Sequence, residues 1–368
     1  MSGRLQALNA LASCLRQAPA SSSGSPCASF DWMPVLEMAN QELLAPALWS
    51  TLRSSSNATL LPADAQEYLA HLHQLNGARN RALRTQAVQL IGALNTAGIR
   101  PIPLKGGLAL FDGPYADPAA RMMRDLDVLV PLGSRETAIA VLEQLGYRLV
   151  QRYAPGHHAF GDFARPNDPG SIDLHTELVD PAYVLPAGEV WARATLKEVD
   201  GVLYFSPDAT DRVMHNLLHA QIHFLGDFYR GELHLQQVHE LVALARYFGP
   251  AVDWRFVEER MRGHRLTTPL ESYLLAAHRL LGLEWPLAAP PSLAARLHYR
   301  RCELLVAAQA LRWTGVLWGN LRGAFAWHRM RALYGSVGGP LRWRGRHLLQ
   351  YVRKRGIGAS VGRLRRID

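Results

Sequence analysis

The spacing of apolar residues predicts a chain that is helical at both ends and mixed in the middle. Between residues 63 and 97 apolar side chains recur every three or four positions, which is typical of one long amphipathic helix, and Gly98 then ends it. Shorter helices are expected at 5–15 and 33–52, the second one capped by Asp31. Beyond residue 207 the helical spacing returns, with helices expected at 208–225, 233–248, 253–263, 268–282 and 292–320.

The middle of the chain alternates short apolar runs with helical spacing. Strands are expected at 99–104, 126–131, 147–153, 171–175 and near 158–163, and helices at 106–111 and 134–145. Such alternation predicts an α/β (α+β) fold in which a small mixed sheet carries helices on one side. N-terminal and C-terminal helical segments are expected to flank this sheet core.

Shifts in composition divide the chain into five parts. The segment 1–30 is expected to be mobile, because the stretch that follows its short helix is rich in Ser, Pro and Gly. The parts that follow are N-terminal helices at 31–98, the sheet core at 99–206, a C-terminal helical domain at 207–325 and a basic tail at 326–368.

The positive charge of the chain is concentrated in its tail. The formal net charge is +9, and residues 341–368 contribute nine Arg or Lys residues against one Asp, which is +8. A nearly neutral body argues against nucleic acid as the substrate, since a template channel should be basic throughout. Two interpretations of the tail remain open. It contacts an anionic partner or membrane surface, or it is a solubilising extension.

Other features of the composition indicate a cytoplasmic protein. The three cysteines show no paired spacing, so neither a disulfide framework nor a zinc knuckle is expected. No apolar run reaches transmembrane length, and Arg16 interrupts the first apolar stretch too early for a signal peptide.

Carboxylates in two expected strands indicate a metal site. Alternate side chains of a strand share a face, so Asp125 and Asp127 are expected to point the same way. Two neighbouring carboxylates repel each other unless a cation lies between them, and a divalent metal with oxygen ligands is the simplest such cation. Asp173, in the expected strand at 171–175, could complete the site.

A phosphate site is expected beside these carboxylates. Gly106 and Gly107 follow Lys105 at the start of an expected helix, where free backbone N–H groups suit an anion. A phosphate cradle with three carboxylates is typical of metal-assisted phosphoryl or nucleotidyl transfer, in which two metals act on the attacking and leaving oxygens.

These residues together resemble a known family. The chain contains, in order, Leu104-Lys105-Gly106, then Tyr115, Asp117, Pro118, Arg121, Asp125, Asp127, Leu129 and Val130, then Asp173-Leu174-His175. This pattern resembles the nucleotidyltransferases of the DNA polymerase β superfamily, and closely its bacterial branch of uncharacterised nucleotidyltransferases, over about residues 30–285. Superfamily members often carry Gly-Ser after the first strand, where this chain carries Gly-Gly.

The resemblance implies an Mg²⁺- or Mn²⁺-dependent nucleotidyltransferase that takes an NTP, with ATP expected. The nucleoside monophosphate would go to a hydroxyl or phosphate acceptor on a small molecule, a peptide or a protein. Asp125 and Asp127 would hold the nucleotide-bound metal, and Asp173 would hold the second metal and orient the acceptor. Phosphate contacts would come from Lys105, Gly106, Gly107 and Arg121. Because Gly-Gly replaces Gly-Ser, the alternative is an inactive nucleotide-binding or scaffold protein of the same fold.

Each candidate residue also has a structural interpretation. The three aspartates could be solvent-facing acids, and the cations Lys105, Arg121 and Arg124 could pair with them. His175 could hydrogen-bond Asp173 or serve as a structural histidine. A row on the expected helix at 208–225 could bind zinc, pack on the sheet or line the substrate pocket; its members are His215, His219, His223 and Asp227.

Overall fold

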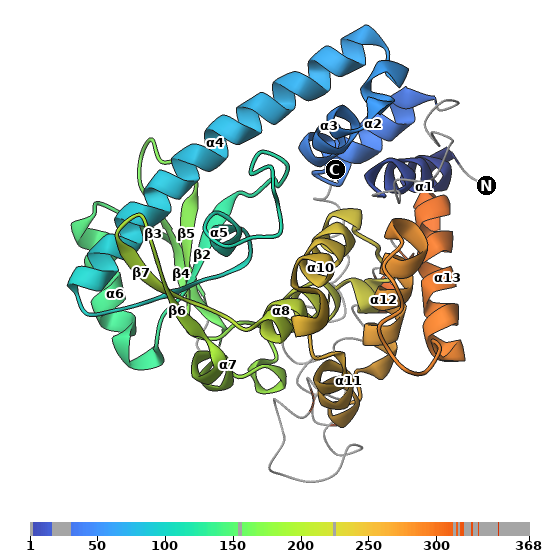
Figure 1. The fold of residues 1–368 in the computed structure, drawn as a ribbon. Helices are drawn as coiled ribbons and strands as arrows, with labels where there is room; N and C mark the ends of the chain where they lie inside the picture. Colours follow the sequence, from blue (N-terminus) through green and yellow to red (C-terminus); the bar gives the residue numbers. More distant parts are fainter. Residues whose placement is uncertain are drawn as a thin grey trace, which may run out of the picture.

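The computed structural model describes residues 3–16, 31–153, 157–223, 226–311, 314–315, 317–319, 325–326, 330 and 345. Most of the expected basic tail, and the linker at 17–30, lie outside these residues. A unit built on a sheet lies beside a helical unit, and the long helix α4 (Ala63–Thr96) extends from the sheet to the N-terminal helices (Figure 1). The fold is therefore the predicted α+β arrangement of a small mixed sheet with helical flanks.

Helix α4 has the bounds that its apolar stripe predicts, to within one residue. Gly98 follows it with a φ of +78°, a left-handed conformation that glycine adopts without strain. Leu83, Leu90 and Leu94 of α4 belong to the same buried cluster as the sheet residues. Nearer its start, α4 packs against α3 (Ala45–Ser54), so one helix joins the sheet to the N-terminal helices.

The prediction of a single helix at 33–52 is wrong. Two helices are present instead, α2 (Trp32–Gln41) and α3, with Pro46 in the first turn of α3. Between them Leu43 has a φ of +55°, which does not continue an α-helix. The predicted cap is confirmed, because the Asp31 side chain accepts the N–H of Met33 at 3.3 Å.

The sheet contains five strands in the order β1-β2-β5-β4-β3. They are β1 (Ile102–Pro103), β2 (Asp125–Leu129), β3 (Arg148–Arg152), β4 (Ala159–Ala164) and β5 (Ser171–His175). The central pair β2 and β5 is parallel, and the other neighbours are antiparallel, so the predicted mixed sheet is confirmed. The strand expected at 99–104 shortens to the two residues of β1.

Helices cover both faces of the sheet, not one as predicted. On one face Leu126, Val128 and Ile172 pack against α4 and α6 (Arg135–Gln144). The opposite face carries the aspartates of β2 and β5 and lies toward α5 (Lys105–Ala109) and α8 (Ala209–Gln221). The apolar face fixes the sheet in the fold, and the polar face is available for chemistry.

A hairpin after the main sheet was not predicted. Strands β6 (Thr195–Val199) and β7 (Val202–Ser206) pair through a tight turn, preceded by α7 (Ala187–Arg193). Asp200 and Gly201 form the turn with φ values of +53° and +74°. Asp-Gly is a frequent pair in two-residue hairpin turns, so the sequence did contain a signal for this turn.

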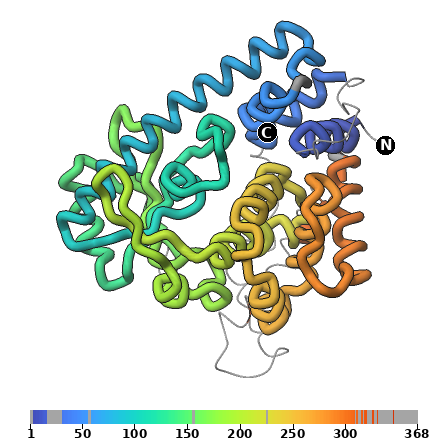
Figure 2. The backbone as a smooth tube through the Cα atoms, in the orientation of Figure 1, coloured from blue at the N-terminus to red at the C-terminus, as the bar shows by residue number. Residues whose placement is uncertain are grey.

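The helical unit comprises α8, α9 (Asp227–Arg230), α10 (Leu235–Phe248), α11 (Trp254–Gly263), α12 (Thr267–Leu281) and α13 (Leu293–Ala307). The prediction of one helix over 292–320 is too long, because α13 ends at Ala307 and a 3₁₀ turn follows at Gln309–Leu311. The N-terminal helix α1 (Gly3–Leu15) packs against both α12 and α13, and Figure 2 shows it beside this last helix. A single buried cluster therefore extends from α1 through α8 to α12.

Short 3₁₀ turns connect several of these elements, at Ser56–Leu60, Leu132–Ser134, Ala182–Val184, Gly249–Ala251 and Gln309–Leu311. Among the described helices, none combines the length and the apolar content that crossing a membrane requires.

Candidate functional site

Acidic side chains form a row across three neighbouring strands. Asp127 on β2 is the register partner of Asp173 on β5, which is in turn the partner of Asp162 on β4. Directly paired residues point to the same face of a sheet, so these three carboxylates lie side by side. Asp125 shares their face at the solvent-accessible start of β2. The structure thus brings the three predicted aspartates together and adds Asp162.

Two basic side chains contact this carboxylate row. Lys105 Nζ donates to Asp127 Oδ1 at 2.7 Å. His175 Nε2 lies 3.1 Å from the same oxygen and 3.0 Å from Asp173 Oδ2, and the His175 ring is 0% exposed. The hydrogen bond between His175 and Asp173 that the sequence analysis considered is therefore present.

These contacts determine which groups are charged. Burial alone would lower the pKa of His175, but its hydrogen bonds to Asp127 and Asp173 raise the pKa to about 9. Burial would raise the pKa of Asp127, yet Lys105 and His175 hold that pKa well below its usual value. Burial and the charge of Asp127 raise the pKa of Asp125. At neutral pH a protonated His175 therefore lies beside an ionised Asp127.

We expect the free energy of unfolding, measured in EDTA, to decrease as the pH rises toward 9. The pKa of His175 is raised in the folded state, so its contribution is complete below the unfolded value of about 6.5 and is lost as the pH rises through about 9. This contribution is about 3 kcal/mol. Urea unfolding at several pH values should show that His175→Gln removes it.

His234 provides the matched control for this measurement. Its hydrogen bond to Asp227 raises the pKa of His234 to about 9, far from the carboxylate row. His234→Gln should therefore remove a separate part of the same pH dependence. An unchanged slope for His175→Gln would contradict the expectation.

The carboxylate row fits a divalent cation. Asp173 Oδ1 is buried, and no hydrogen-bond partner for it exists among the described residues. Burying a carboxylate oxygen is costly unless a donor or a cation contacts it. Carboxylate oxygens are also the ligands that Mg²⁺ and Mn²⁺ prefer. Asp125, Asp127 and Asp173 are thus suited to the metal that the sequence resemblance implies.

Gly106 makes room for Arg121. A Cβ atom on Gly106 would collide with the Arg121 guanidinium and would lie 3.0 Å from the Cβ of Met123. Arg121 NH2 donates to both carboxylate oxygens of Glu240, at 2.9 and 2.8 Å, and this ion pair is mostly buried. The first glycine therefore has a packing function beside its predicted phosphate contact, whereas a Cβ on Gly107 would make ordinary contacts.

The comparison with known families agrees with this geometry. The sequence profile of the family described as uncharacterised nucleotidyltransferase matches residues 28–282, which contain the whole carboxylate row. The chain belongs to this nucleotidyltransferase family. Among curated proteins, none matches the chain.

Asp117 of the nucleotidyltransferase motif anchors the loop before β2. Its Oδ2 atom accepts from Ser50 at 2.7 Å and lies 2.7 Å from His73 Nε2. Asn80 of α4 donates to the Arg121 carbonyl at 2.8 Å, in the same loop. These bonds attach the loop to α3 and α4, and so they position Arg121.

Asp117→Ala should lower the free energy of unfolding by about 2 kcal/mol, because several partly buried hydrogen bonds lose their acceptor. Chemical denaturation would measure the loss. Asp64→Ala is the control, since Asp64 lies in the exposed first turn of α4 and should change stability by about 0.5 kcal/mol or less. Equal effects of the two substitutions would contradict the anchoring role.

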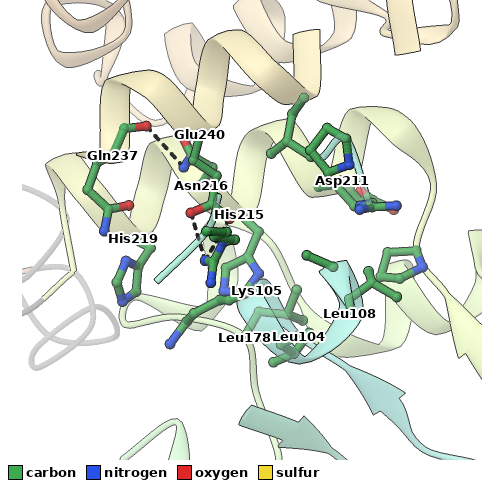
Figure 3. Close-up of a pocket in the computed structure, with 16 residues that line it drawn as sticks. Leu104, Lys105, Leu108, Leu178, Asp211, His215, Asn216, His219, Gln237 and Glu240 are labelled. Carbon is green, nitrogen blue, oxygen red and sulfur yellow. Dashed lines mark hydrogen bonds and ion pairs between the residues drawn. The ribbon is translucent and has the colours of Figure 1, made fainter. Parts of the chain in front are cut away.

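The motif did not indicate a pocket that lies beside Lys105 (Figure 3). Side chains from α5, α8 and α10 surround it, with Leu104, Leu108 and Leu178 on its apolar part. Burial, with the charge of Lys105, lowers the pKa of His215 to about 3, so this ring is neutral. Its Nε2 atom is buried and has no hydrogen-bond partner in the described part of the chain. The pocket therefore offers a polar group to a bound molecule.

The histidines of α8 contact one another and then the sheet. Ring centroids are 6.3 Å apart for His215 and His219, and 5.4 Å apart for His219 and His223. His223 lies at 4.4 Å from His158, which precedes β4. Asp227 does not belong to this row, because its carboxylate pairs with His234 Nδ1 at 2.9 Å. Among the described residues, two groups that include histidine bring three ligand atoms within 4.8 Å of one another, and neither contains His215, His219 or His223. His215 and His219 line the pocket, and His223 packs on the sheet through His158.

The remaining predicted cation and two unpredicted acids complete the site. The Arg124 side chain is exposed, and its backbone carbonyl accepts a hydrogen bond from the Arg79 guanidinium at 3.1 Å. Glu240 is the one acid on α10, and a lone acid on a largely apolar helix was a signal that could have identified it. Asp162 lies between Gly161 and Phe163 in β4. The residue that it pairs with on the neighbouring strand depends on strand register, which the sequence does not show.

Proposed function

We propose that this chain is a metal-dependent nucleotidyltransferase that moves a nucleoside monophosphate from an NTP, with ATP the first candidate. The acceptor is a hydroxyl or phosphate group on a small molecule, a peptide or a protein. Membership of the family supports nucleotidyl transfer in general terms. The observation that carries the proposal is the register pairing of Asp127 with Asp173, beside Lys105, with one Asp173 oxygen lacking a partner among the described residues.

The carboxylates have distinct roles in this proposal. Asp125 and Asp127 hold the metal that accompanies the triphosphate, and Asp173 holds a second metal and orients the acceptor. Bound divalent metals supply Lewis-acid stabilisation of the attacking and leaving oxygens. The acceptor oxygen forms a bond to the α-phosphorus while the bond from that phosphorus to the bridging oxygen breaks, and pyrophosphate leaves. A hydroxyl acceptor gives its proton to Asp173 in this step.

Positive side chains stabilise the leaving group. Negative charge increases on the pyrophosphate as the bond breaks, so cations placed near it lower the barrier. Lys105 and Arg121 both line the pocket beside the carboxylate row. Glu240 orients Arg121 through two hydrogen bonds, and the backbone at Gly106 and Gly107 completes the phosphate contacts.

A nucleotide titration paired with a pyrophosphate-release assay tests the proposal. ATP, GTP, CTP and UTP would each be used with Mg²⁺ and Mn²⁺, on the wild type and on Asp125→Asn/Asp127→Asn. We expect metal-dependent binding, with release or self-labelling that the double variant loses. Asp200→Asn is the control, because Asp200 occupies an exposed turn in which asparagine is equally suited.

The alternative is an inactive nucleotide-binding protein, which is supported by the absence of a hydroxyl side chain at Gly107. Binding without release would require acceptors of all three classes to be screened. Continued absence of release in that screen would support the inactive alternative. A folded protein that binds none of the four nucleotides would overturn the proposal.

A further inference from the structure

Imidazole rings adjoin the carboxylate row on the side of Asp173. Potential ligand atoms of His158, Asp173 and His175 lie within 4.8 Å of one another. We propose that these three residues bind a first-row divalent transition metal, Mn²⁺, Co²⁺ or Zn²⁺, through two imidazole nitrogens and a carboxylate oxygen. This inference extends the proposed function, with which it shares Asp173 as the ligand of the second metal.

His175 has the orientation of a metal-ligating histidine. Its Nδ1 atom lies 3.2 Å from the Glu177 carbonyl oxygen, which can accept a proton from that nitrogen. The other nitrogen, Nε2, points at Asp173 Oδ2 and Asp127 Oδ1. Metal-ligating histidines almost always bond their second nitrogen in this way, because the bond fixes the ring and its tautomer. A cation at this point would replace the contact between Nε2 and the carboxylates.

The spacing of His175 and Asp173 is already close to that of two ligands on one metal ion. Two ligands at 2.0–2.1 Å from a tetrahedral metal are about 3.3 Å apart. His175 Nε2 and Asp173 Oδ2 are separated by 3.0 Å. The second oxygen, Asp173 Oδ1, is the buried atom that lacks a hydrogen-bond partner among the described residues. Asp173 can therefore turn either oxygen toward a cation.

His158 is held firmly at the end of the sheet. Its carbonyl accepts the backbone N–H groups of Thr176 and Glu177, at 3.0 and 2.9 Å, which join the start of β4 to the end of β5. Its ring is 4.9 Å from the His175 ring and 4.4 Å from that of His223. A ligand on a fixed backbone is positioned before the metal binds.

The surrounding charge favours a cation. Asp162 is the register partner of Asp173, and Asp127 is the partner on its other side. The Tyr153 hydroxyl donates to Asp162 Oδ2 at 2.9 Å and so fixes that carboxylate beside the proposed ligands. Imidazole ligands suit Zn²⁺ and other first-row metals, whereas Mg²⁺ prefers oxygen ligands and retains its waters. The donor set therefore selects against Mg²⁺ at this position.

Bound Mn²⁺ provides a direct test, without nucleotide. Pulsed electron paramagnetic resonance detects coupling of the Mn²⁺ electron spin to ¹⁴N nuclei of coordinated imidazole. We expect this coupling in the wild type, and we expect His158→Ala and His175→Gln each to reduce it and to weaken Mn²⁺ binding at least about tenfold. His71→Ala, on the exposed side of α4, should behave as the wild type.

Three outcomes would overturn the inference: no ¹⁴N coupling in wild type with bound Mn²⁺, coupling that neither histidine variant reduces, or equal affinities for Mn²⁺ and Mg²⁺. The wild-type spectrum is decisive even if a variant does not fold. The two proposals can fail separately. Imidazole-bound Mn²⁺ without nucleotide binding would overturn the proposed function alone, and pyrophosphate release by a protein with purely oxygen-bound Mn²⁺ would overturn this inference alone.

Discussion

Asp127→Asn should decrease the rate of nucleotidyl transfer by about 10³-fold, which corresponds to about 4 kcal/mol. Asp127 is 3% exposed, pairs with Lys105 and His175, and is a proposed ligand of the nucleotide-bound metal. An amide keeps the shape of the carboxylate but loses the charge that attracts the metal. The measurement is the rate of pyrophosphate release at saturating nucleotide, once an acceptor or self-labelling has been found.

The same substitution should change the ionisation of His175. Without the charge of Asp127, the pKa of His175 should decrease from about 9, since burial then has less opposition. NMR titration of the ring would detect this shift independently of activity. Asp168→Asn is a suitable control, because Asp168 pairs with Arg165 and not with the carboxylate row. Wild-type rates for Asp127→Asn would contradict its role as a ligand.

Gly106→Ala should lower the free energy of unfolding by about 4 kcal/mol and abolish nucleotide binding. The added Cβ would displace the Arg121 guanidinium and separate it from Glu240. Breaking a buried ion pair typically costs about 3–5 kcal/mol, because one charge remains buried without its partner. Chemical denaturation would measure the stability, and titration with ATP would measure the binding.

Gly107→Ala is the matched control, one position along the same helix. Its Cβ would lie 3.6 Å from the Asp127 carbonyl oxygen and 3.7 Å from Leu126, which are ordinary contacts. Alanine also has the higher helix propensity, by about 1 kcal/mol. We therefore expect Gly107→Ala to be neutral or slightly stabilising. Equal losses in the two variants would show that Arg121 does not need the space at Gly106.

Elements with a strong local signal could be predicted from the sequence. The stripe of α4 extends over many turns, and the acids of β2 and β5 stand in short apolar runs, so both were found. The carboxylate row followed from alternation within each strand, together with the family resemblance. The break at Leu43 was missed, because apolar periodicity continues across it while the backbone does not.

Contacts between distant segments could not be predicted in the same way. Arg121 and Glu240 are 119 residues apart, and only the tertiary fold brings α10 to the loop that carries Arg121. Asp162 joins the row through strand register, and a shift of one residue would place it on the opposite face. His158 lies just before a strand, with no local pattern that distinguishes it from a structural histidine.

The helix α1 has a practical consequence for choosing fragments of this protein. Both α1 and α13 lie outside the matched residues 28–282, yet they pack against each other and against α12. Leu11 of α1 is 0% exposed, and Arg16 Nε donates to the Leu280 carbonyl at 3.0 Å. Expression boundaries drawn at the limits of the family would remove both helices and leave the apolar surface of α12 exposed to water. If such a fragment aggregates, the cause is the removal of α1 and α13, and the result says nothing about the chemistry of the site.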